Sequence, residues 1–219
     1  MIIGKKTLVS PVGLDSLNDD GIPAEFHDRS LLHDNKVPSF SVYILHQAWS
    51  AFLLRATDEY INHGNEASGI ILGYYLKDKF GEYVMGTHFE PGTGDSTTSV
   101  YCEISVQDQL RIIRVAEQKK LLQLIWIHSH PSFGAFYSTV DYRTLKSMYY
   151  APHQAGIVVD NIKKEYMGFK VMNHAAHEFK EIFLVNRDDR LHLVSKPFNK
   201  NPVKAFYAKT GNINTGTRN

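Results

Sequence analysis

The sequence is poor in cysteine and has no excess of either charge. Cys102 is the single cysteine among 219 residues, so an internal disulfide is excluded. Lysine and arginine number 24 against 23 acidic residues, which gives a formal net charge of +1. A chain so close to neutrality has no long-range attraction for nucleic acid or for an anionic membrane surface. We therefore expect neither nucleic acid nor a membrane as a partner.

Long apolar runs and a secretion signal are also missing. No stretch approaches the roughly 18 consecutive apolar residues that span a bilayer, and the first residues lack a basic, apolar and small-residue leader pattern. With 43% hydrophobic and 21% charged residues, the composition is typical of a globular protein with one core. Together with the single cysteine, these features predict a cytoplasmic protein.

The chain divides into three parts by composition. Residues 1–36 are rich in turn formers and predict an irregular arm, whereas residues 197–219 predict a basic, flexible tail. Residues 37–196 predict one mixed α/β domain, with a central sheet flanked by helices. Strands are expected at 39–45, 66–78, 81–90, 100–105, 121–127, 154–160, 165–173, 180–186 and 190–195, and helices at 46–62, 105–120 and 139–150.

The first two helices carry apolar residues at helical spacing, which predicts their buried faces. Gly64 is expected to close the first helix, and Ser105 with Asp108 to cap the second. Residues 91–99, rich in glycine, serine and threonine, predict a loop. The expected buried positions are Ala48, Phe52, Leu53, Ala56, Tyr60 and Ile61 in the first helix, and Leu110, Ile113, Val115 and Ala116 in the second.

Chemistry concentrates in the stretch IWIHSHPSFGAFYSTVD, residues 125–141. On an extended backbone His128 and His130 point to the same side, while Ser129 points to the other. Asp141 returns eleven residues after His130 and could be the third ligand of a catalytic zinc site. Two interpretations without a metal stay open. A His-X-His pair at a strand end can consist of surface histidines that bind nothing, and Ser138 with Asp141 can act only as a helix cap.

A hydrolytic metal site also needs a base near the metal. Glu66 is the best candidate, because an acid at the start of a buried apolar strand is unfavourable unless it has a function or lies at the edge of the sheet. The alternative is a solvated residue that merely precedes the strand.

These residues together resemble the JAMM, or MPN+, family of zinc metalloproteases. His128, Ser129 and His130 are followed after seven residues by Ser138 and after two more by Asp141, as in the family signature. Upstream, the stretch EASGIILG, residues 66–73, is similar to the family's glutamate motif. The resemblance covers roughly residues 39–185 and implies a cytidine-deaminase-like fold.

The resemblance also implies a role for each of these residues. His128, His130 and Asp141 are expected to hold one zinc ion, Glu66 to act as general acid and base, and Ser138 to stabilise the oxyanion. The implied reaction is hydrolysis of the peptide or isopeptide bond after the C-terminal glycine of ubiquitin or a ubiquitin-like protein.

The same resemblance suggests partners and leaves alternatives. Residues 91–99 lie where related enzymes insert a flap over the substrate tail, and Phe133, Phe136 and Tyr137 either line that channel or simply pack. A compact enzyme of the prokaryotic type is favoured. Such enzymes resemble those found with bacterial ubiquitin-like proteins and their activating and conjugating enzymes, which are therefore possible partners, including in systems linked to antiphage defence. The alternatives are a non-catalytic MPN scaffold and a DNA-linked protein of the RadC branch.

Overall fold

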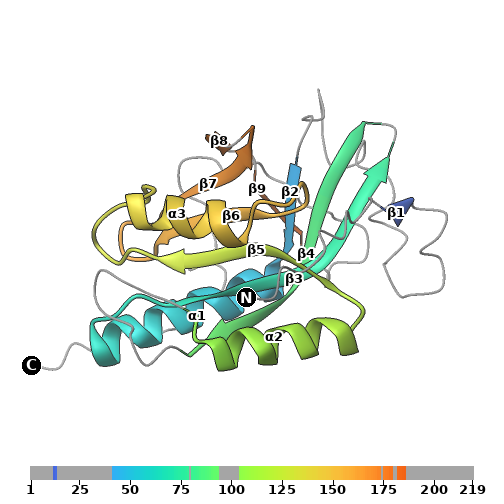
Figure 1. Ribbon diagram of the computed structural model, residues 1–219. Helices are drawn as coiled ribbons and strands as arrows, with labels where there is room; N and C mark the ends of the chain where they lie inside the picture. Colours follow the sequence, from blue (N-terminus) through green and yellow to red (C-terminus); the bar gives the residue numbers. More distant parts are fainter. Residues whose placement is uncertain are drawn as a thin grey trace, which may run out of the picture.

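A mixed β-sheet with helices on both faces forms the centre of the structure (Figure 1). The computed structural model describes residues 12–13, 41–78, 80–93, 104–173, 175–179 and 182–185. The helices within these ranges are α1 (His46–His63), α2 (Val106–Gln118) and α3 (Thr139–Met148). The strands are β1 (Val12–Gly13), β2 (Ser41–Leu45), β3 (Ser68–Asp78), β4 (Gly81–Gly92), β5 (Leu122–Ser129), β6 (Ala155–Asp160), β7 (Glu165–Met172), β8 (Ala175–Phe179) and β9 (Ile182–Val185).

The strand order places β5 in the interior of the sheet. The described strands follow the order β8-β7-β6-β5-β3-β4-β2-β9, with β1 beside β3. Strand β5 runs antiparallel to β3 and parallel to β6, and Ser68 lies opposite His128 while Ser129 lies opposite Val159. The end of β5 is therefore enclosed by the start of β3 and the end of β6.

Successive apolar residues in the central strands supply both faces of the sheet. Ile71 packs with α1 residues such as Phe52, whereas Ile70 packs with Ile112 of α2 and Leu145 of α3. Strands covered on both faces need apolar side chains at almost every position, which explains the continuous apolar runs in the sequence. The expected mixed α/β fold, a sheet flanked by helices, is confirmed.

The predicted end of α1 is confirmed, but its buried face is shorter than expected. Gly64 adopts φ 69° and its N–H bonds back to Tyr60 O, as a left-handed C-cap does. Ala48, Trp49, Phe52, Leu53 and Ala56 are buried, whereas Ile61 is 72% exposed. The prediction that Ile61 is buried was wrong, because the last turn of α1 extends beyond the sheet-covered core.

The predicted buried face of α2 was also wrong in part. Leu110 is 50% exposed and Ile113 is 39% exposed, while Ile112 and Ala116 are buried. Asp108 determines which side of α2 faces the core. It is buried, it accepts hydrogen bonds from Thr93 of the preceding segment, and it lies one helical turn before Ile112. The cap predicted at the head of this helix is confirmed, because Ser105 Oγ accepts the Asp108 N–H at 3.1 Å.

Several expectations differ at the margins or lie outside the described residues. Strand β8 was missed because it is a largely exposed edge strand with few apolar residues. Residues 104–105 are not in a strand, and residues 100–103 lie outside the described ranges, as do the strand expected at 190–195 and the tail at 197–219. In the N-terminal arm, only 12–13 are described, and they pair with β3 rather than being irregular. No helix in the described ranges is long and apolar enough to cross a bilayer.

Candidate metal centre

The end of β5 delivers two histidines to one side of the sheet. His128 and His130 are 1% and 6% exposed, so both rings are inside the protein. Ser129 points to the opposite side, where its Oγ accepts the Ala67 N–H at 2.9 Å, and its own N–H donates to Ala67 O at 2.9 Å. This double contact fastens the segment just before β3 to the end of β5. The expected divergence of Ser129 from the two histidines is confirmed.

Asp141 reaches the histidines because a helix cap fixes its side chain. Ser138 Oγ accepts the Asp141 N–H at 3.1 Å, and Asp141 Oδ2 accepts the Ser138 N–H at 2.8 Å. This reciprocal capping box begins α3 and leaves Asp141 buried. Asp141 Oδ1 lies 3.1 Å from His128 Nε2, and Oδ2 lies 3.5 Å from His130 Nε2. The cap and the metal-ligand interpretations of Asp141 are thus compatible.

Three potential ligands converge in this way on one point. One ligand atom from each of His128, His130 and Asp141 lies within 4.8 Å of the others. His128 Nε2 and His130 Nε2 both face the Asp141 carboxylate, and His128 Nε2 is buried without a well-directed hydrogen bond although Asp141 Oδ1 lies 3.1 Å away. Buried polar atoms in proteins are almost always partnered, so imidazole nitrogens gathered around a carboxylate in this way are the donor set that a metal ion completes. The three residues therefore form a group that can hold a metal ion.

Glu66 stands at the edge of this group. It lies two residues before β3, is only 4% exposed, and places Oε1 3.8 Å from His130 Nε2. The interpretation of Glu66 as a solvated residue is therefore wrong: the Ala67–Ser129 contact draws this segment into the interior.

Comparison with known proteins assigns the family. The family model for prokaryotic homologues of the JAB domain matches residues 45–172, which is more than half of the chain. The chain belongs to this family. The resemblance to JAMM/MPN proteins inferred from the motifs is thereby confirmed, and the matched range contains the whole candidate metal centre.

Two individual proteins illustrate the likeness of this JAB domain to others. A STAM-binding protein-like protein of Xenopus laevis is 29% identical over 129 residues, which are 58% of this chain and 29% of that protein. The chain thus matches less than a third of this relative's length. The solution structure of protein DSY2949 from Desulfitobacterium hafniense covers 69% of this chain and 97% of its own, with a TM-score of 0.50 and 18% identity. At that identity the likeness concerns the fold alone.

The protonation states of the side chains in the candidate metal centre suit metal binding. Burial would raise the pKa of Asp141, but the neighbouring His128 and the hydrogen bonds with Ser138 outweigh it and lower that pKa to about 2. Burial, and then the nearby His128, lower the pKa of His130 to about 4. At neutral pH Asp141 is consequently an anion and His130 is a neutral imidazole, which are the forms that coordinate metals.

Glu66 has the opposite perturbation. Burial, followed by the charge of Asp141, raises the pKa of Glu66 from 4.5 to about 8. A carboxyl group whose pKa lies near neutrality can exchange a proton in both directions at physiological pH. A cation held by the three ligands would shift this pKa downwards, because a nearby positive charge favours the carboxylate.

The aromatic residues between His130 and Ser138 divide into two kinds. Phe133 and Phe136 are 55% and 47% exposed, and the ring centroid of Phe136 lies 4.9 Å from that of His130. Tyr137 instead packs inward, with its ring centroid 3.9 Å from that of Phe169. Tyr137 therefore packs on the inner side of the metal centre, where its ring centroid also lies 6.5 Å from that of His128, while the more exposed Phe136 borders the centre from the solvent side.

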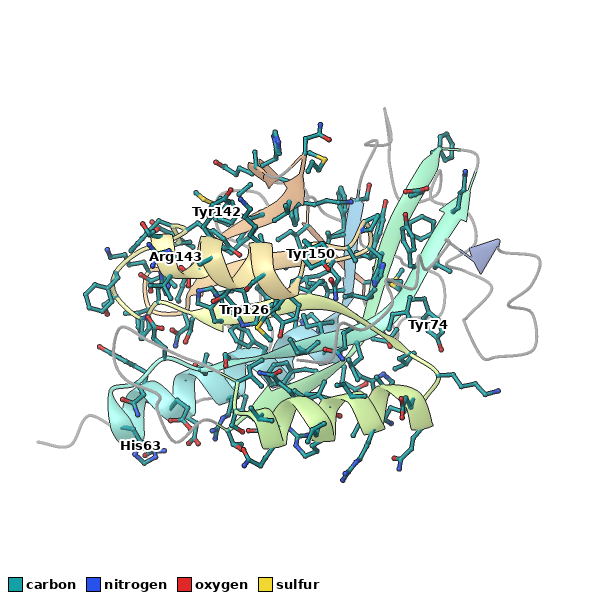
Figure 2. All side chains as sticks on the ribbon, in the orientation of Figure 1. His63, Tyr74, Trp126, Tyr142, Arg143 and Tyr150 are labelled. Carbon is teal, nitrogen blue, oxygen red and sulfur yellow. The ribbon has the colours of Figure 1, made fainter. Side chains whose placement is uncertain are left out.

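One neighbour of the site escaped sequence reasoning. Trp126 stacks on His128 with ring centroids 4.4 Å apart and on Tyr149 with centroids 5.8 Å apart. Figure 2 shows Trp126 on β5, and it belongs to the apolar cluster that also contains Ile112 of α2 and Leu145 of α3. The spacing of two residues between Trp126 and His128 in a strand places both on one face and is the signal that could have identified it. The stack holds the His128 ring in a fixed plane.

Proposed function

We propose that the protein is a zinc-dependent peptidase or isopeptidase that cleaves after the C-terminal glycine of ubiquitin or a ubiquitin-like protein. The observation that carries the proposal is the combination of a His-His-Asp group with a buried carboxyl group beside it whose pKa is raised towards neutrality. A ligand group alone is compatible with a structural metal, whereas Glu66 adds a group that can move protons. A bound zinc ion would act as a Lewis acid that acidifies water and polarises a carbonyl.

The side chains of this chain then have separate tasks. Glu66 accepts a proton from the attacking water and returns one to the departing amine, for which a pKa near neutrality is suited. His128, His130 and Asp141 hold the metal.

The hydroxyl group of Ser138 lies beside the Asp141 carboxylate, to which it contributes a side-chain hydrogen bond. Its Oγ serves as acceptor for the Asp141 N–H in the helix cap, and a hydroxyl that accepts can still donate its own hydrogen. We propose that this hydrogen is donated to the oxyanion that forms on the scissile carbonyl. The cap holds the Ser138 Oγ in place before substrate binds, so only the hydroxyl hydrogen has to turn from Asp141 to the oxyanion.

A substrate of protein size needs a docking surface beside this centre. The end of β4 lies next to the start of β3, because Gly92 pairs with Ser68, and Ser68 in turn lies opposite His128. Helix α2 follows at this end of the sheet and exposes Val106, Leu110 and Ile113 along one side. Exposed apolar side chains clustered on one surface are typical of protein contacts. We propose that a ubiquitin-like protein docks there while its extended tail approaches the metal.

The setting of the enzyme belongs to the same proposal. We propose a cytoplasmic protease, with residues 37–196 as the catalytic domain, that works with ubiquitin-activating or ubiquitin-conjugating enzymes in a bacterial conjugation or antiphage defence system. The match to a family of prokaryotic JAB homologues supports such a setting. Neither nucleic acid nor a membrane is part of it.

The decisive experiment uses candidate ubiquitin-like proteins in two forms, a linear C-terminal extension and an isopeptide conjugate. We expect mass spectrometry to show cleavage after the terminal glycine, abolished by a chelator and restored by zinc. The Glu66→Gln variant should bind zinc and leave both substrates intact. Zinc binding without cleavage of any candidate would oppose a peptidase and favour a non-catalytic binding module.

A further inference from the structure

Asp160, the last residue of β6, gathers four backbone N–H groups from two loops. Its side chain is fully buried. Oδ1 accepts the N–H groups of Ser132 at 3.0 Å, Ile162 at 2.9 Å and Lys163 at 2.8 Å, and Oδ2 accepts the Gly134 N–H at 2.6 Å. The carboxylate thus ties the turn that follows His130 to the turn between β6 and β7. Multiple N–H donors are what make a buried carboxylate tolerable.

The turn that Asp160 holds has an unfavourable backbone. Ser132 adopts φ 71° and Gly134 adopts φ 94°, so two of three successive residues lie in the left-handed region. For a residue with a side chain this region is unfavourable, and it persists only where the surroundings enforce it. The two N–H groups bound by the Asp160 carboxylate belong to these same two residues. The side chain therefore selects a backbone that the turn would not adopt by itself.

This turn begins directly at a proposed metal ligand. The His130 N–H donates to Val159 O at 2.9 Å, and the Phe133 N–H donates to His130 O at 3.2 Å. Val159 immediately precedes Asp160 in β6. His130 is therefore held on its N-terminal side by the strand ladder and on its C-terminal side by the turn. If the turn relaxes, the direction of the His130 side chain relaxes with it.

We propose that Asp160 is a positioning residue for the metal centre: through the N–H groups of Ser132 and Gly134 it fixes the turn that aims His130. The proposal rests on the proposed function of the metal centre. Asp160 acts on the backbone of the turn and not on the reacting atoms. Partners that orient a metal ligand typically contribute about 10- to 100-fold to metal affinity.

The test is the zinc affinity of Asp160→Asn, measured by competition with a chromogenic chelator, together with the absorption spectrum of the cobalt-substituted protein. Asparagine keeps the shape but replaces one acceptor oxygen by an NH2 group that faces an N–H donor. We expect zinc affinity to fall about 10- to 100-fold and the cobalt spectrum to change. A folded Asp160→Asn protein with the affinity and the spectrum of the wild type would overturn the proposal.

A matched control separates positioning from general loss of stability. Asp108 is likewise a buried carboxylate with several hydrogen bonds, including the Thr93 N–H at 2.7 Å and the Ser105 hydroxyl at 3.0 Å, but it serves the head of α2. Asp108→Asn should lower the melting temperature and leave zinc affinity unchanged. An equal loss of affinity in both variants would assign the effect to stability and overturn the positioning role.

A second variant and a second measurement cover the remaining outcomes. If Asp160→Asn does not fold, Gly134→Ala strains the same turn at φ 94° while its Cβ meets no atom closer than 3.6 Å, and unchanged zinc affinity there overturns the proposal. If the wild type binds no zinc, the proposed function fails by itself. The positioning role is then judged in the metal-free protein, by amide exchange at Ser132 and Gly134 and by the His130 ring resonances. Both amide exchange rates and the ring resonances must differ from those of the wild type in Asp160→Asn and must equal them in Asp108→Asn.

Discussion

Replacement of Glu66 by glutamine should abolish hydrolysis while it stabilises the metal-free fold. Glutamine has the shape of the protonated acid but can neither take nor give the proton that the reaction needs. Glutamine is also uncharged at every pH. It therefore avoids the cost of burying a carboxylate and of placing it near Asp141, the two causes that raise the pKa of Glu66 to about 8. Activity and stability are therefore expected to change in opposite directions at one residue.

The sign and size of the stability effect follow from the pKa of Glu66. Because this pKa is about 8 in the folded protein against an ordinary 4.5, its contribution to stability is complete below pH 4.5 and is lost as the pH rises towards 8. The full difference corresponds to a ceiling of about 5 kcal/mol, and screening by water makes about 2 to 3 kcal/mol a realistic expectation. Glutamine escapes this loss, so the advantage of the variant should grow with pH and level off above pH 8.

Urea unfolding of chelator-treated protein at pH 5 and pH 8.5 measures this effect directly. The free energy of unfolding of Glu66→Gln should exceed that of the wild type at pH 8.5 and nearly equal it at pH 5. Glu117→Gln, on the exposed side of α2, is the matched control and should show no such trend. A difference between Glu66→Gln and the wild type that is independent of pH would refute the argument that Glu66 is protonated in the metal-free fold.

Three further outcomes test the site as a whole. His128→Ala and Asp141→Ala should each lower zinc affinity, measured by chelator competition. The loss should exceed the roughly 10- to 100-fold that follows when a residue that only orients a metal ligand is removed. If either variant keeps the affinity of the wild type, the residue replaced in it is not a ligand. Zinc at 100 times its dissociation constant should raise the free energy of unfolding by about 2.7 kcal/mol, and a melting temperature insensitive to zinc would contradict a site in the folded state. Ser138→Ala should lose about 1 kcal/mol with its helix cap and roughly 100-fold in kcat with its donor. Ser138→Thr keeps the hydroxyl group and should retain both; equal kcat in Ser138→Ala and the wild type would exclude an oxyanion role.

The parts of the centre that could be predicted from the sequence are those that local rules determine. The side to which His128 and His130 point follows from strand alternation, and the place of Asp141 follows from a capping box within four residues. Both depend on neighbours in the chain and on no distant contact. The order of strands and helices was likewise predictable, since the apolar runs of doubly covered strands are visible in the sequence.

What could not be predicted depends on contacts between distant segments. The role of Glu66 was expected from the family resemblance, but its contact with His130 depends on the pairing of Ala67 with Ser129, sixty-two residues away, and no local pattern records that register. The buried face of α2 was misjudged for a similar reason. A polar residue, Asp108, turns inward to meet Thr93, so a count of apolar residues selects the wrong side of the helix. The edge strand β8 gave little apolar signal because it pairs with β7 alone and most of its side chains are exposed, although Phe179 packs against the core.

The hydrogen bonds that build the centre join protein groups to one another. The capping box, the Ser129 contacts with Ala67 and the His130 bond to Val159 are ordinary secondary-structure hydrogen bonds, and none of them needs a cation. Two unfavourable features of the centre are ones that a cation would relieve. They are the buried Nε2 of His128, which has no hydrogen bond, and the carboxyl group of Glu66, which keeps its proton beside Asp141. A divalent cation that relieves both features while these hydrogen bonds stay in place should bind with little structural change, because binding then orders little of the chain.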